Sequence, residues 1–598
     1  MSINYRPDID GLRAIAVVSV IFYHADNSIK NLKILSGGFV GVDIFFVISG
    51  FLITSIILKE LNETGAFSFK NFYKRRIKRI IPVLLLVFIT TFPFIWLFFI
   101  PISFIDFSKS LLSSLFFVSN YHFYFSGELY NAESSLLKPL MHTWSLSIEE
   151  QYYIIFPLVL TIVFKFFKNQ LFKVFLILFL ISFISMIFIF QKNESLAFFS
   201  FLARFWELLL GGITAILYSQ KKSIKNFNDN IYSILGLLMI IFSIFFYNDS
   251  TKSPHIPTLL PVLGTSLVIY FNNKSGFVYK ILSLKYLVFL GLISYSLYLW
   301  HYPVFSIGRT TEFFGDGVSK KLFLITFFLS LISYYLIEKP IKIKKFTNYK
   351  IFILLGFFYL VLISLSLASI SEKIKAVRGD VLKNLFVGDQ TSNLTVCNGN
   401  KVNKDGYCVF NSKENKTLIL IGDSHMQTLE KPLLEFSNKN KFKLIVLNRP
   451  TCFYFLDLDL IIKNKLSGCT AKYQEKRRKI ILSQSNATVI MGGRTPLYLS
   501  GENFDNLEGG GDNKKAKGFF YNSKNTSKSK KSNNNVLINK SLNKTIDDLK
   551  DNSVKIVLIY PIPEVGWNVS KKLITRLALS REGLEGIFES NPLTTSHK

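Results

Sequence analysis

The sequence predicts a polytopic α-helical membrane domain of about ten spans plus one linking span, followed by a soluble α/β domain. Apolar runs of roughly 17–20 residues, the length that crosses a bilayer, recur between residues 11 and 370. Hydrophobic residues make up 49% of the 598-residue chain, and 60 residues are Phe. After residue 371, short apolar runs alternate with helix-like stretches, which is typical of a parallel α/β unit.

Eleven apolar runs are predicted to cross the membrane. They are Gly11–Asp26, Phe39–Leu58, Ile80–Ile100, Ile148–Phe164, Leu171–Phe190, Phe198–Tyr218, Ile231–Tyr247, Ile256–Phe271, Tyr286–Phe305, Leu322–Ile337 and Ile351–Ile370. The run Phe104–Phe125 is ambiguous because it contains Asp106, Lys109, Asn120 and His122.

The basic residues predict which side of the membrane each loop faces. If residues 104–125 do not cross and the N-terminus is cytoplasmic, the inside loops hold 21 Lys and Arg and the outside loops hold nine. Cytoplasmic loops carry the excess of these residues, and one more crossing would reverse the bias. We therefore expect residues 101–147 to dip into the membrane or pack on it from outside. The chain is then a multi-pass membrane protein with its N-terminus inside and its tail outside.

The charge and the cysteines exclude two classes of partner. The net charge of +30 is shared between loops of the membrane half and a Lys/Asn/Ser-rich stretch of the tail, so no nucleic acid is expected. The cysteines form no CxxC pair and have no paired His, so no metal is expected. Four cysteines in one domain favour two disulfides in an oxidising compartment, with four unpaired thiols as the alternative. They are Cys397, Cys408, Cys452 and Cys469.

Four short apolar runs of the tail predict strands with helices between them. They are Thr417–Ile421, Phe442–Leu447, Thr488–Met491 and Lys555–Tyr560. Residues 501–535 are predicted to be a disordered insertion. The expected domains are 1–345 (membrane domain), 346–372 (linking transmembrane helix), 373–416 (periplasmic linker) and 417–598 (α/β domain).

Ionisable side chains inside spans are costly and by default functional. His24 lies near the outer end of the first span, and Arg13 lies eleven residues earlier, about 16 Å along a helix. An imidazole oriented by a carboxylate can take a proton from an acceptor hydroxyl. We therefore interpret His24 with Glu149 as catalytic, and Arg204 with Glu207 as a structural ion pair.

The segment Tyr73–Arg79 is the densest basic run of the membrane half. It fits a plain topology signal. It also fits a phosphate site, because guanidinium groups bind phosphates bidentately. Coenzyme A, with its 3′-phosphate and pyrophosphate, suits such a cytoplasmic site below an apolar path.

Several motifs occur in order over about 340 residues: Asp10–Ala14 leading to His24, Phe45–Phe51, Arg76-x-x-Arg79, His142–Gln151, Arg204–Gly212 and Ser294–His301. Together they resemble the acyltransferase 3 family of membrane O-acyltransferases. The chain is similar to the subgroup in which an extra span joins this domain to a periplasmic SGNH domain. This similarity implies a multi-pass protein of the bacterial inner membrane with a cytoplasmic N-terminus and a periplasmic tail.

The resemblance implies acetyl-CoA as the cytoplasmic acyl donor and an O-antigen or another surface polysaccharide as the acceptor. It implies His24 as the essential histidine and Arg76 and Arg79 as donor-handling residues. Arg13, Glu149 and Trp144 are implied near the acceptor path. We also count Arg13 with the donor-binding residues.

The residues Gly422-Asp423-Ser424-His425 directly follow an apolar strand. A strand that ends in Gly-Asp-Ser and turns into a helix resembles the nucleophile turn of SGNH esterases and acyltransferases. A serine needs an adjacent base and donors for the developing oxyanion. The backbone N–H of Ser424 and the helix N-terminus offer such donors, with Gly492 and Gly493 as the best further place. We assign Ser424 and Asp423 to catalysis.

The segment Tyr560–Asn568 is also similar to the fused family. SGNH enzymes carry an Asp-x-x-His near their C-terminus that supplies the base. Here the residue three before His597 is Thr594, so we do not assign His597 as the base. We expect the α/β/α SGNH-like domain to be incomplete at its C-terminus.

The sequence thus predicts an O-acetyltransferase that moves acetyl from cytoplasmic acetyl-CoA onto a hydroxyl of a surface polysaccharide or of its lipid-linked precursor. Two other functions stay open. The chain could transport a lipid-linked glycan or acyl group, with a glycan-binding tail. Alternatively, the membrane domain is an enzyme and the tail is a non-catalytic esterase relic.

Overall fold

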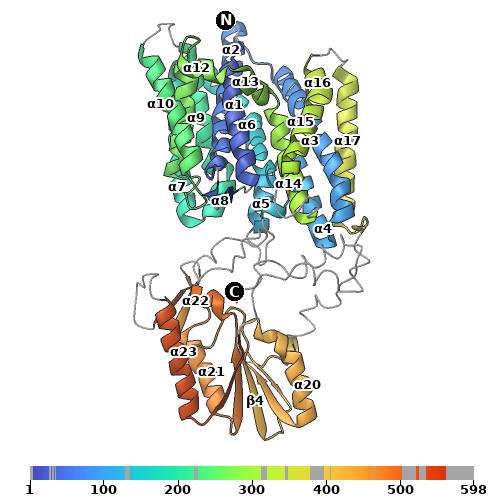
Figure 1. The fold of residues 1–598 in the computed structure, drawn as a ribbon, viewed down its shortest axis with the longest axis vertical. Helices are drawn as coiled ribbons and strands as arrows, with labels where there is room; N and C mark the ends of the chain where they lie inside the picture. Colours follow the sequence, from blue (N-terminus) through green and yellow to red (C-terminus); the bar gives the residue numbers. More distant parts are fainter. Residues whose placement is uncertain are drawn as a thin grey trace. The chain divides into compact units, whose positions relative to one another are not determined.

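The computed structural model describes residues 5–25, 28–29, 32–33, 35–127, 135–220, 227–311, 320–343, 348–377, 396–403, 406–462, 465–500, 520–523 and 534–560. The chain forms two compact units, Met1–Gly379 and Asp380–Lys598, each with its own hydrophobic core (Figure 1). In its described residues, the first unit is helical apart from a ribbon of two two-residue strands, and the second is an α/β unit.

The elements of the first unit follow one another with short connections. They are α1 (Pro7–Ala25), β1 (Ser28–Ile29), β2 (Leu32–Lys33), η1 (Gly38–Val40), α2 (Gly41–Thr64), α3 (Phe69–Phe98), α4 (Pro101–Leu115), α5 (Ser119–Gly127), η2 (Ser135–Leu137), α6 (Thr143–Phe167), η3 (Lys168–Gln170), α7 (Leu171–Lys192), α8 (Glu194–Phe199), α9 (Phe201–Gln220), α10 (Phe227–Phe246), η4 (Ile256–Thr258), α11 (Leu259–Phe271), α12 (Phe277–Leu282), α13 (Lys285–Leu292), α14 (Ser294–Thr311), α15 (Lys320–Ser333), the π-helical turn η5 (Tyr334–Glu338), α16 (Lys339–Ile343) and α17 (Asn348–Ile370).

These helices make the first unit a multi-pass membrane domain. Within the described residues, seven helical runs are long and apolar enough to span a bilayer, or eight if the bent pair α13–α14 is one span. The run Thr143–Lys192 counts once although it holds two predicted spans. α1 is not counted, and it carries Asp8, Asp10 and Arg13. The total of eleven spans therefore stays a prediction.

The predicted span Tyr286–Phe305 is not one straight helix. Its two halves, α13 and α14, meet at an angle of 63°. A Cβ added to Gly291 would overlap the carbonyl oxygen of Asp10, so α13 packs directly on the backbone of α1. Small residues allow such close contacts between helices. Beyond the bend, α14 reaches the opposite end of α1, where His301 meets His24.

The ambiguous run Phe104–Phe125 forms two short helices. α4 has 15 residues and α5 has nine, which gives lengths of about 22 and 13 Å, less than the roughly 30 Å of a bilayer core. The chain turns between them at Phe117, whose φ is 54°. This geometry supports the expectation that residues 101–147 make no net crossing.

The second unit is built on a five-stranded sheet in the order β10-β8-β4-β5-β3. Its strands are β3 (Cys408–Phe410), β4 (Lys416–Gly422), β5 (Phe442–Val446), β8 (Ala487–Gly492) and β10 (Lys555–Leu558). The four predicted strands are confirmed as the parallel part of the sheet, and β3 adds an antiparallel edge.

Helices cover both faces of this sheet. They are η7 (Met426–Leu429), α20 (Glu430–Asn440), α21 (Ala471–Leu482), α22 (Thr495–Ser500) and α23 (Asn534–Asp551), with η6 (Gly399–Lys401) before the sheet. Side chains of β4 alternate between the faces. Ile419 and Ile421 pack in one cluster with residues of α21 and α23, while Leu418 packs in another with residues of α20. Figure 1 shows α21 and α23 on one side of the sheet and α20 on the other. The α/β/α architecture is therefore confirmed.

A second, small sheet corrects part of the predicted insertion 501–535. It contains β6 (Leu458–Ile462), β7 (Lys465–Leu466) and β9 (Phe520–Ser523), in the order β7-β6-β9. Phe520 and Tyr521 are good strand formers, and they pair with β6 in an antiparallel register. Residues 501–519 and 524–533 lie outside the described residues.

Candidate active sites

The last turn of α1 brings His24 against α14. Nδ1 of His24 lies 3.1 Å from Nε2 of His301, and the two rings stack with centroids 5.2 Å apart. His301 is fully buried, while His24 is partly exposed. Arg309, two turns further along α14, donates a hydrogen bond to the carbonyl oxygen of His24. α14 therefore holds both the side chain and the backbone of His24.

Phenol, imidazole and hydroxyl groups surround this pair. The ring of Tyr302 meets His24 edge-on at 4.9 Å and stacks on His142 at 5.5 Å. The hydroxyl of Tyr298 lies 2.6 Å from Oγ of Ser145 and donates to the carbonyl oxygen of His142 at 2.9 Å. The surroundings of His24 are thus rich in groups that exchange protons with hydroxyl groups.

Glu149 lies at a different place from the one predicted. Its carboxylate accepts a hydrogen bond from Tyr153 at 3.0 Å, and its charged neighbours include Arg79 and Arg13. No hydrogen bond joins it to His24 within the described part of the chain. The expectation of a carboxylate beside His24 is therefore corrected. α6 begins at Thr143, and six more residues carry Glu149 about 9 Å along the helix axis.

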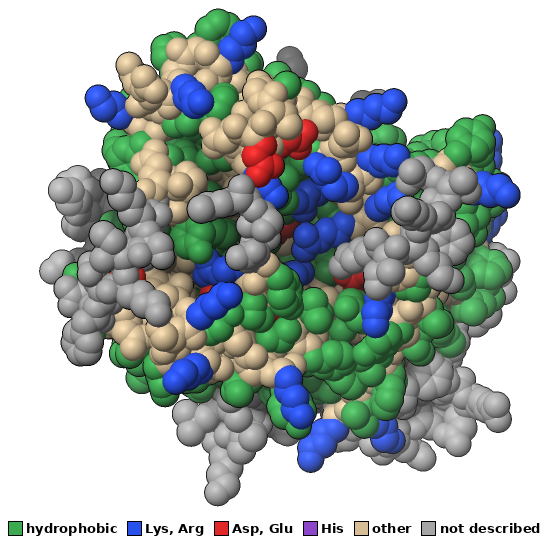
Figure 2. Space-filling view, turned by 90° about the horizontal axis from the view of Figure 1, so that it is seen from above, with side chains coloured by type: hydrophobic (Ala, Val, Ile, Leu, Met, Phe, Trp, Pro, Cys, Tyr) green, Lys and Arg blue, Asp and Glu red, His purple; other side chains and the backbone are tan. Residues whose placement is uncertain are grey.

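Arg13, Arg76 and Arg79 come from two helices, and all three are electrostatic neighbours of Glu149 of α6. Arg79 is an electrostatic neighbour of both Arg13 and Arg76, and Glu149 is one of Arg76. The guanidinium of Arg76 lies over the ring of Tyr153, 5.3 Å from its centre. Lys and Arg side chains gather around the middle of the face seen in Figure 2. Such a concentration of guanidinium groups suits a phosphorylated ligand.

Sequence reasoning missed Glu338. This buried residue lies in the π-helical turn η5, is an electrostatic neighbour of Arg13, and accepts a hydrogen bond from Ser296 at 3.1 Å. π-helical turns often occur at functional sites. The available signal was an acidic residue next to the end of the predicted span Leu322–Ile337. Because Glu338 was assigned to the following loop, it was not considered as a residue of the membrane interior.

The predicted ion pair of Arg204 and Glu207 is confirmed and extended. Nη1 of Arg204 lies 2.7 Å from Glu207 and 2.9 Å from Asp43 of α2, and all three side chains are buried. Its guanidinium also lies over the ring of Trp144, at 5.4 Å. Trp144, which the resemblance implied near the acceptor path, therefore packs on this cluster.

Ser424 follows β4 at the carboxyl end of the sheet. Gly422 pairs with Gly492 of β8, so the serine turn and the loop after β8 begin side by side. Ser424 is partly buried. The helix expected after the turn begins as the short 3-10 segment η7 and continues as α20.

Asp423 connects the serine turn to the loop after β8. Its carboxylate accepts hydrogen bonds from the backbone N–H of His425 at 2.8 Å, the backbone N–H of Arg494 at 2.7 Å and the hydroxyl of Tyr498 at 2.8 Å. Both oxygens are engaged and the side chain is buried. These contacts give Asp423 an orienting position, and its direct part in catalysis stays a prediction.

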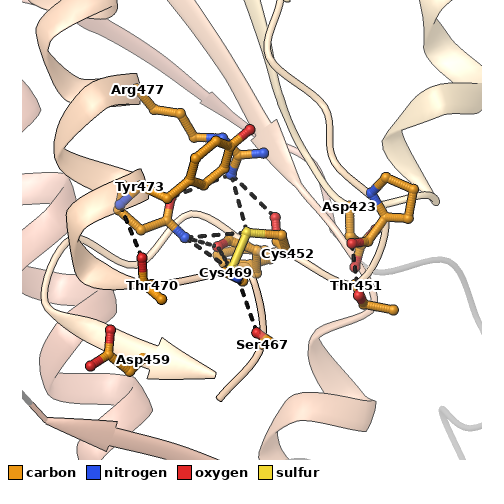
Figure 3. The surroundings of a disulfide bond; sticks show 12 residues. Asp423, Thr451, Cys452, Asp459, Ser467, Cys469, Thr470, Tyr473 and Arg477 are labelled. Carbon is orange, nitrogen blue, oxygen red and sulfur yellow. Dashed lines mark hydrogen bonds between the residues drawn. A yellow bond between two sulfur atoms is a disulfide. The ribbon is translucent and has the colours of Figure 1, made fainter. Parts of the chain in front are cut away.

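The four cysteines form two disulfides, Cys397–Cys408 and Cys452–Cys469, so the predicted number is confirmed. Figure 3 shows Cys452–Cys469 beneath α21, with Arg477 and Tyr473 above it. Arg477 is buried and donates to the carbonyl oxygen of Cys452 at 3.3 Å. Burial lowers the pKa of Arg477, and Tyr473 opposes that shift.

This disulfide anchors a loop that flanks the serine turn. The loop begins at Arg449, whose backbone N–H donates to the carbonyl oxygen of Gly422 at 3.0 Å. It ends at Cys452, and Thr451 between them has φ of 57°. Residues 449–452 are therefore fixed at one end by the sheet and at the other by the disulfide.

Thr594 and His597 lie outside the described residues, as does most of Tyr560–Asn568. In the described part of the second unit, the histidine is His425. Its Nδ1 is buried and has no hydrogen-bond partner among the described residues.

Comparisons with known proteins agree with both units. The model of the acyltransferase domain family matches residues 6–336, and that of the SGNH domain fused to AT3 domains matches residues 396–595. O-acetyltransferase OatA of Staphylococcus aureus strain NCTC 8325 is 35% identical over 361 residues. A second protein of that species, from strain MSSA476 and provisionally named an O-acetyltransferase, is 36% identical over 360 residues.

Each alignment covers 57% of this chain and 58% of the relative, so the chain spans less than two thirds of the length of these relatives. No solved structure is significantly similar to the chain.

Proposed function

This chain belongs to the family of membrane acyltransferases with a fused SGNH domain, and on that premise we propose that it is a polysaccharide O-acetyltransferase. It takes acetyl from acetyl-CoA in the cytoplasm and delivers it to a hydroxyl of a surface polysaccharide or of its lipid-linked precursor. Relatives named O-acetyltransferase support acetyl as the transferred group. The reaction replaces the thioester C–S bond by an ester C–O bond, and CoA leaves as the thiol.

The donor end is the arginine cluster. Arg13, Arg76 and Arg79 are all electrostatic neighbours of Glu149, and the guanidinium of Arg76 lies over the ring of Tyr153. CoA carries a 3′-phosphate and a pyrophosphate, which guanidinium groups bind with paired hydrogen bonds. The basic face in Figure 2 attracts such a polyanion. We assign this face to the cytoplasm, in line with the excess of Lys and Arg in the inside loops.

The acceptor end is His24, eleven residues from Arg13 and therefore about 16 Å further along α1. His24 takes the proton of the attacking hydroxyl and returns it to the departing group. The arrangement separates donor binding and proton transfer along one helix. This separation, with a basic cluster at one end of α1 and a partly exposed imidazole at the other, is the observation that carries the proposal.

The second unit completes transfer outside the membrane. The hydroxyl of Ser424 attacks the ester formed at His24 and releases its alcohol, and a glycan hydroxyl then attacks the acetyl-serine and frees Ser424. Asp423 keeps the turn in place through its three hydrogen bonds. The two disulfides support a location in an oxidising compartment. The base for Ser424 is not among the groups that contact this turn in the described residues.

The test replaces His24 by Ala and measures ester-linked acetate on surface polysaccharide from cells that produce the protein. We expect acetate to fall to the level of cells without the protein, with an unchanged amount of protein in the membrane. His255→Ala is the matched control, since His255 packs on Phe190 away from α14. Undiminished acetate in His24→Ala contradicts the proposal.

Purified full-length protein separates this function from transport. In detergent, an acyltransferase transfers the acetyl group of labelled acetyl-CoA to an added glycan hydroxyl or to water and releases CoA as the thiol, whereas a transporter of a lipid-linked glycan releases none.

A further inference from the structure

A chain of hydrogen bonds through His301 fixes where the proton of His24 resides. Nδ1 of His301 lies 2.6 Å from the backbone carbonyl oxygen of Tyr298. A carbonyl oxygen only accepts, so Nδ1 of His301 carries the proton. In the neutral ring, Nε2 of His301 is then an acceptor, and it faces Nδ1 of His24 at 3.1 Å. Nδ1 of His24 must therefore donate, which leaves the lone pair of His24 on Nε2.

We propose that His301 is the positioning residue that gives His24 its reactive tautomer, with the lone pair of Nε2 directed to the acceptor hydroxyl. The inference rests on the proposed function, because it requires His24 to act as the base. Nε2 of His24 makes no hydrogen bond to any described residue, and the ring is partly exposed. His301, by contrast, is fully buried.

A histidine suits this position better than the carboxylate that the sequence suggested. A carboxylate next to His24 would place a negative charge in the apolar interior, where charges are expensive. Neutral His301 accepts the same hydrogen bond without that charge. When His24 becomes protonated, its Nδ1–H can be shared with Nε2 of His301, so the new positive charge spreads over two stacked rings.

The surrounding contacts hold both rings in this register. Arg309 fixes the backbone carbonyl of His24, and Tyr302 packs against its ring. Tyr298, which supplies the carbonyl for His301, is itself bound through its hydroxyl to Ser145. The proton assignment of His24 is thus determined by the backbone of α14.

Two amide substitutions at residue 301 test the proposal. The two variants differ from each other by a single methylene. In His301→Gln the amide oxygen reaches about the place of Nε2, whereas in His301→Asn it reaches only about the place of Nδ1. We measure CoA release from acetyl-CoA by the full-length protein in detergent, with kcat and KM determined separately.

We expect His301→Gln to keep kcat within about tenfold of the wild type, and His301→Asn to lose about 100-fold or more, the usual worth of acid–base catalysis. KM for acetyl-CoA should stay the same in both, because the donor site lies at the other end of α1. His255→Gln and His255→Asn form the matched control pair and should leave kcat unchanged.

Equal kcat in His301→Gln and His301→Asn, whether high or low, overturns the inference. So does an effect confined to KM. If the wild type itself releases no CoA, the proposed function fails and this inference falls with it. If the wild type is active, His24→Ala is inactive and the two amide variants do not differ, only the role of His301 is rejected.

Discussion

Gly493 lies so close to Asp423 that a Cβ on Gly493 would be 2.8 Å from Oδ2 of Asp423. Gly493 also has φ of 158°. The loop after β8 therefore reaches the carboxylate only because residue 493 has no side chain. This contact joins the serine turn to the loop after β8, and it makes that turn sensitive to a single methyl group.

Gly493→Ala should destabilise the second unit by about 1–3 kcal/mol, the usual cost of one strained backbone residue. It should also reduce acetate transfer to the glycan, because the carboxylate of Asp423 must move. Thermal unfolding of the full-length protein in detergent measures the first effect. Gly356→Ala is the control, since nothing lies within 4 Å of a Cβ at Gly356. Equal unfolding temperatures in the two variants contradict the prediction.

Ser424→Ala and Asp423→Asn should distinguish a residue needed for acetyl transfer from one needed for the stability of the turn. Ser424→Ala removes the nucleophile, so glycan acetate should be lost while stability stays within about 0.5 kcal/mol of the wild type. In Asp423→Asn, the side-chain N–H₂ faces N–H and O–H donors that it cannot accept from. This loss of hydrogen bonds should lower the free energy of unfolding by about 1–3 kcal/mol. Both quantities are measured on the same full-length preparations. Normal acetate in Ser424→Ala would show that the second unit is a glycan-binding relic.

Arg76→Gln should raise KM for acetyl-CoA by about tenfold, the effect of losing about 1.4 kcal/mol of phosphate binding. Arg75→Gln is a close control because Arg75 belongs to the same basic run but is exposed and paired with Glu60 at 3.6 Å. Kinetics with acetyl-CoA and with its analogue that lacks the 3′-phosphate identify the contact. If both variants raise KM equally, general attraction by the basic face explains donor binding.

Arg204→Met should reduce the folded protein in the membrane strongly. It leaves the carboxylates of Asp43 and Glu207 buried without their cation, and breaking a buried pair in this way costs about 3–5 kcal/mol. The triple variant with Asp43→Asn and Glu207→Gln should recover much of that loss. The monodisperse fraction in size-exclusion chromatography is the readout. A triple variant as unstable as Arg204→Met argues that stacking on Trp144, rather than charge, holds the cluster.

Replacing Cys452 and Cys469 by Ser should lower the free energy of unfolding of the second unit by about 3 kcal/mol, the expectation for a disulfide that closes a loop of about 15 residues. The same variant should also reduce acetate transfer. The second effect follows from the loop 449–452, which this disulfide anchors beside Gly422. The matched variant, Cys397→Ser with Cys408→Ser, removes the other disulfide, which closes a loop of similar size. It should affect stability but not transfer at temperatures where the protein is folded, as measured on surface polysaccharide.

Features whose deciding residues are close together in the sequence were predicted correctly. The strand Thr417–Ile421 is apolar throughout because both faces of β4 are covered, so its type and direction followed from composition. The ion pair of Arg204 and Glu207 followed from a spacing of three residues on one helix. In each case the deciding neighbours are close in the sequence.

The remaining features depend on contacts between distant residues. Nothing in the run Tyr286–Phe305 marks the bend of 63°, which arises where Gly291 packs on the backbone of α1. The partner of His24 is 277 residues away and no local pattern marks it. The chemistry of an imidazole oriented by a carboxylate suggested Glu149, another ionisable residue of a span, instead. β9 was hidden because its four residues lie among lysines and asparagines that outweigh Phe520 in composition.

The order of the main sheet has a consequence for how relatives of this protein can diverge. From β4 the chain adds β5 on one side and β8 and β10 on the other, so the loops after β5 and β8 leave the sheet in opposite directions on either side of Ser424. Each loop is attached through its own strand. The two loops nevertheless meet, because Phe453 after β5 lies against Gly493 and Tyr498 after β8. A change in one loop of a relative must therefore be matched by a change in the other.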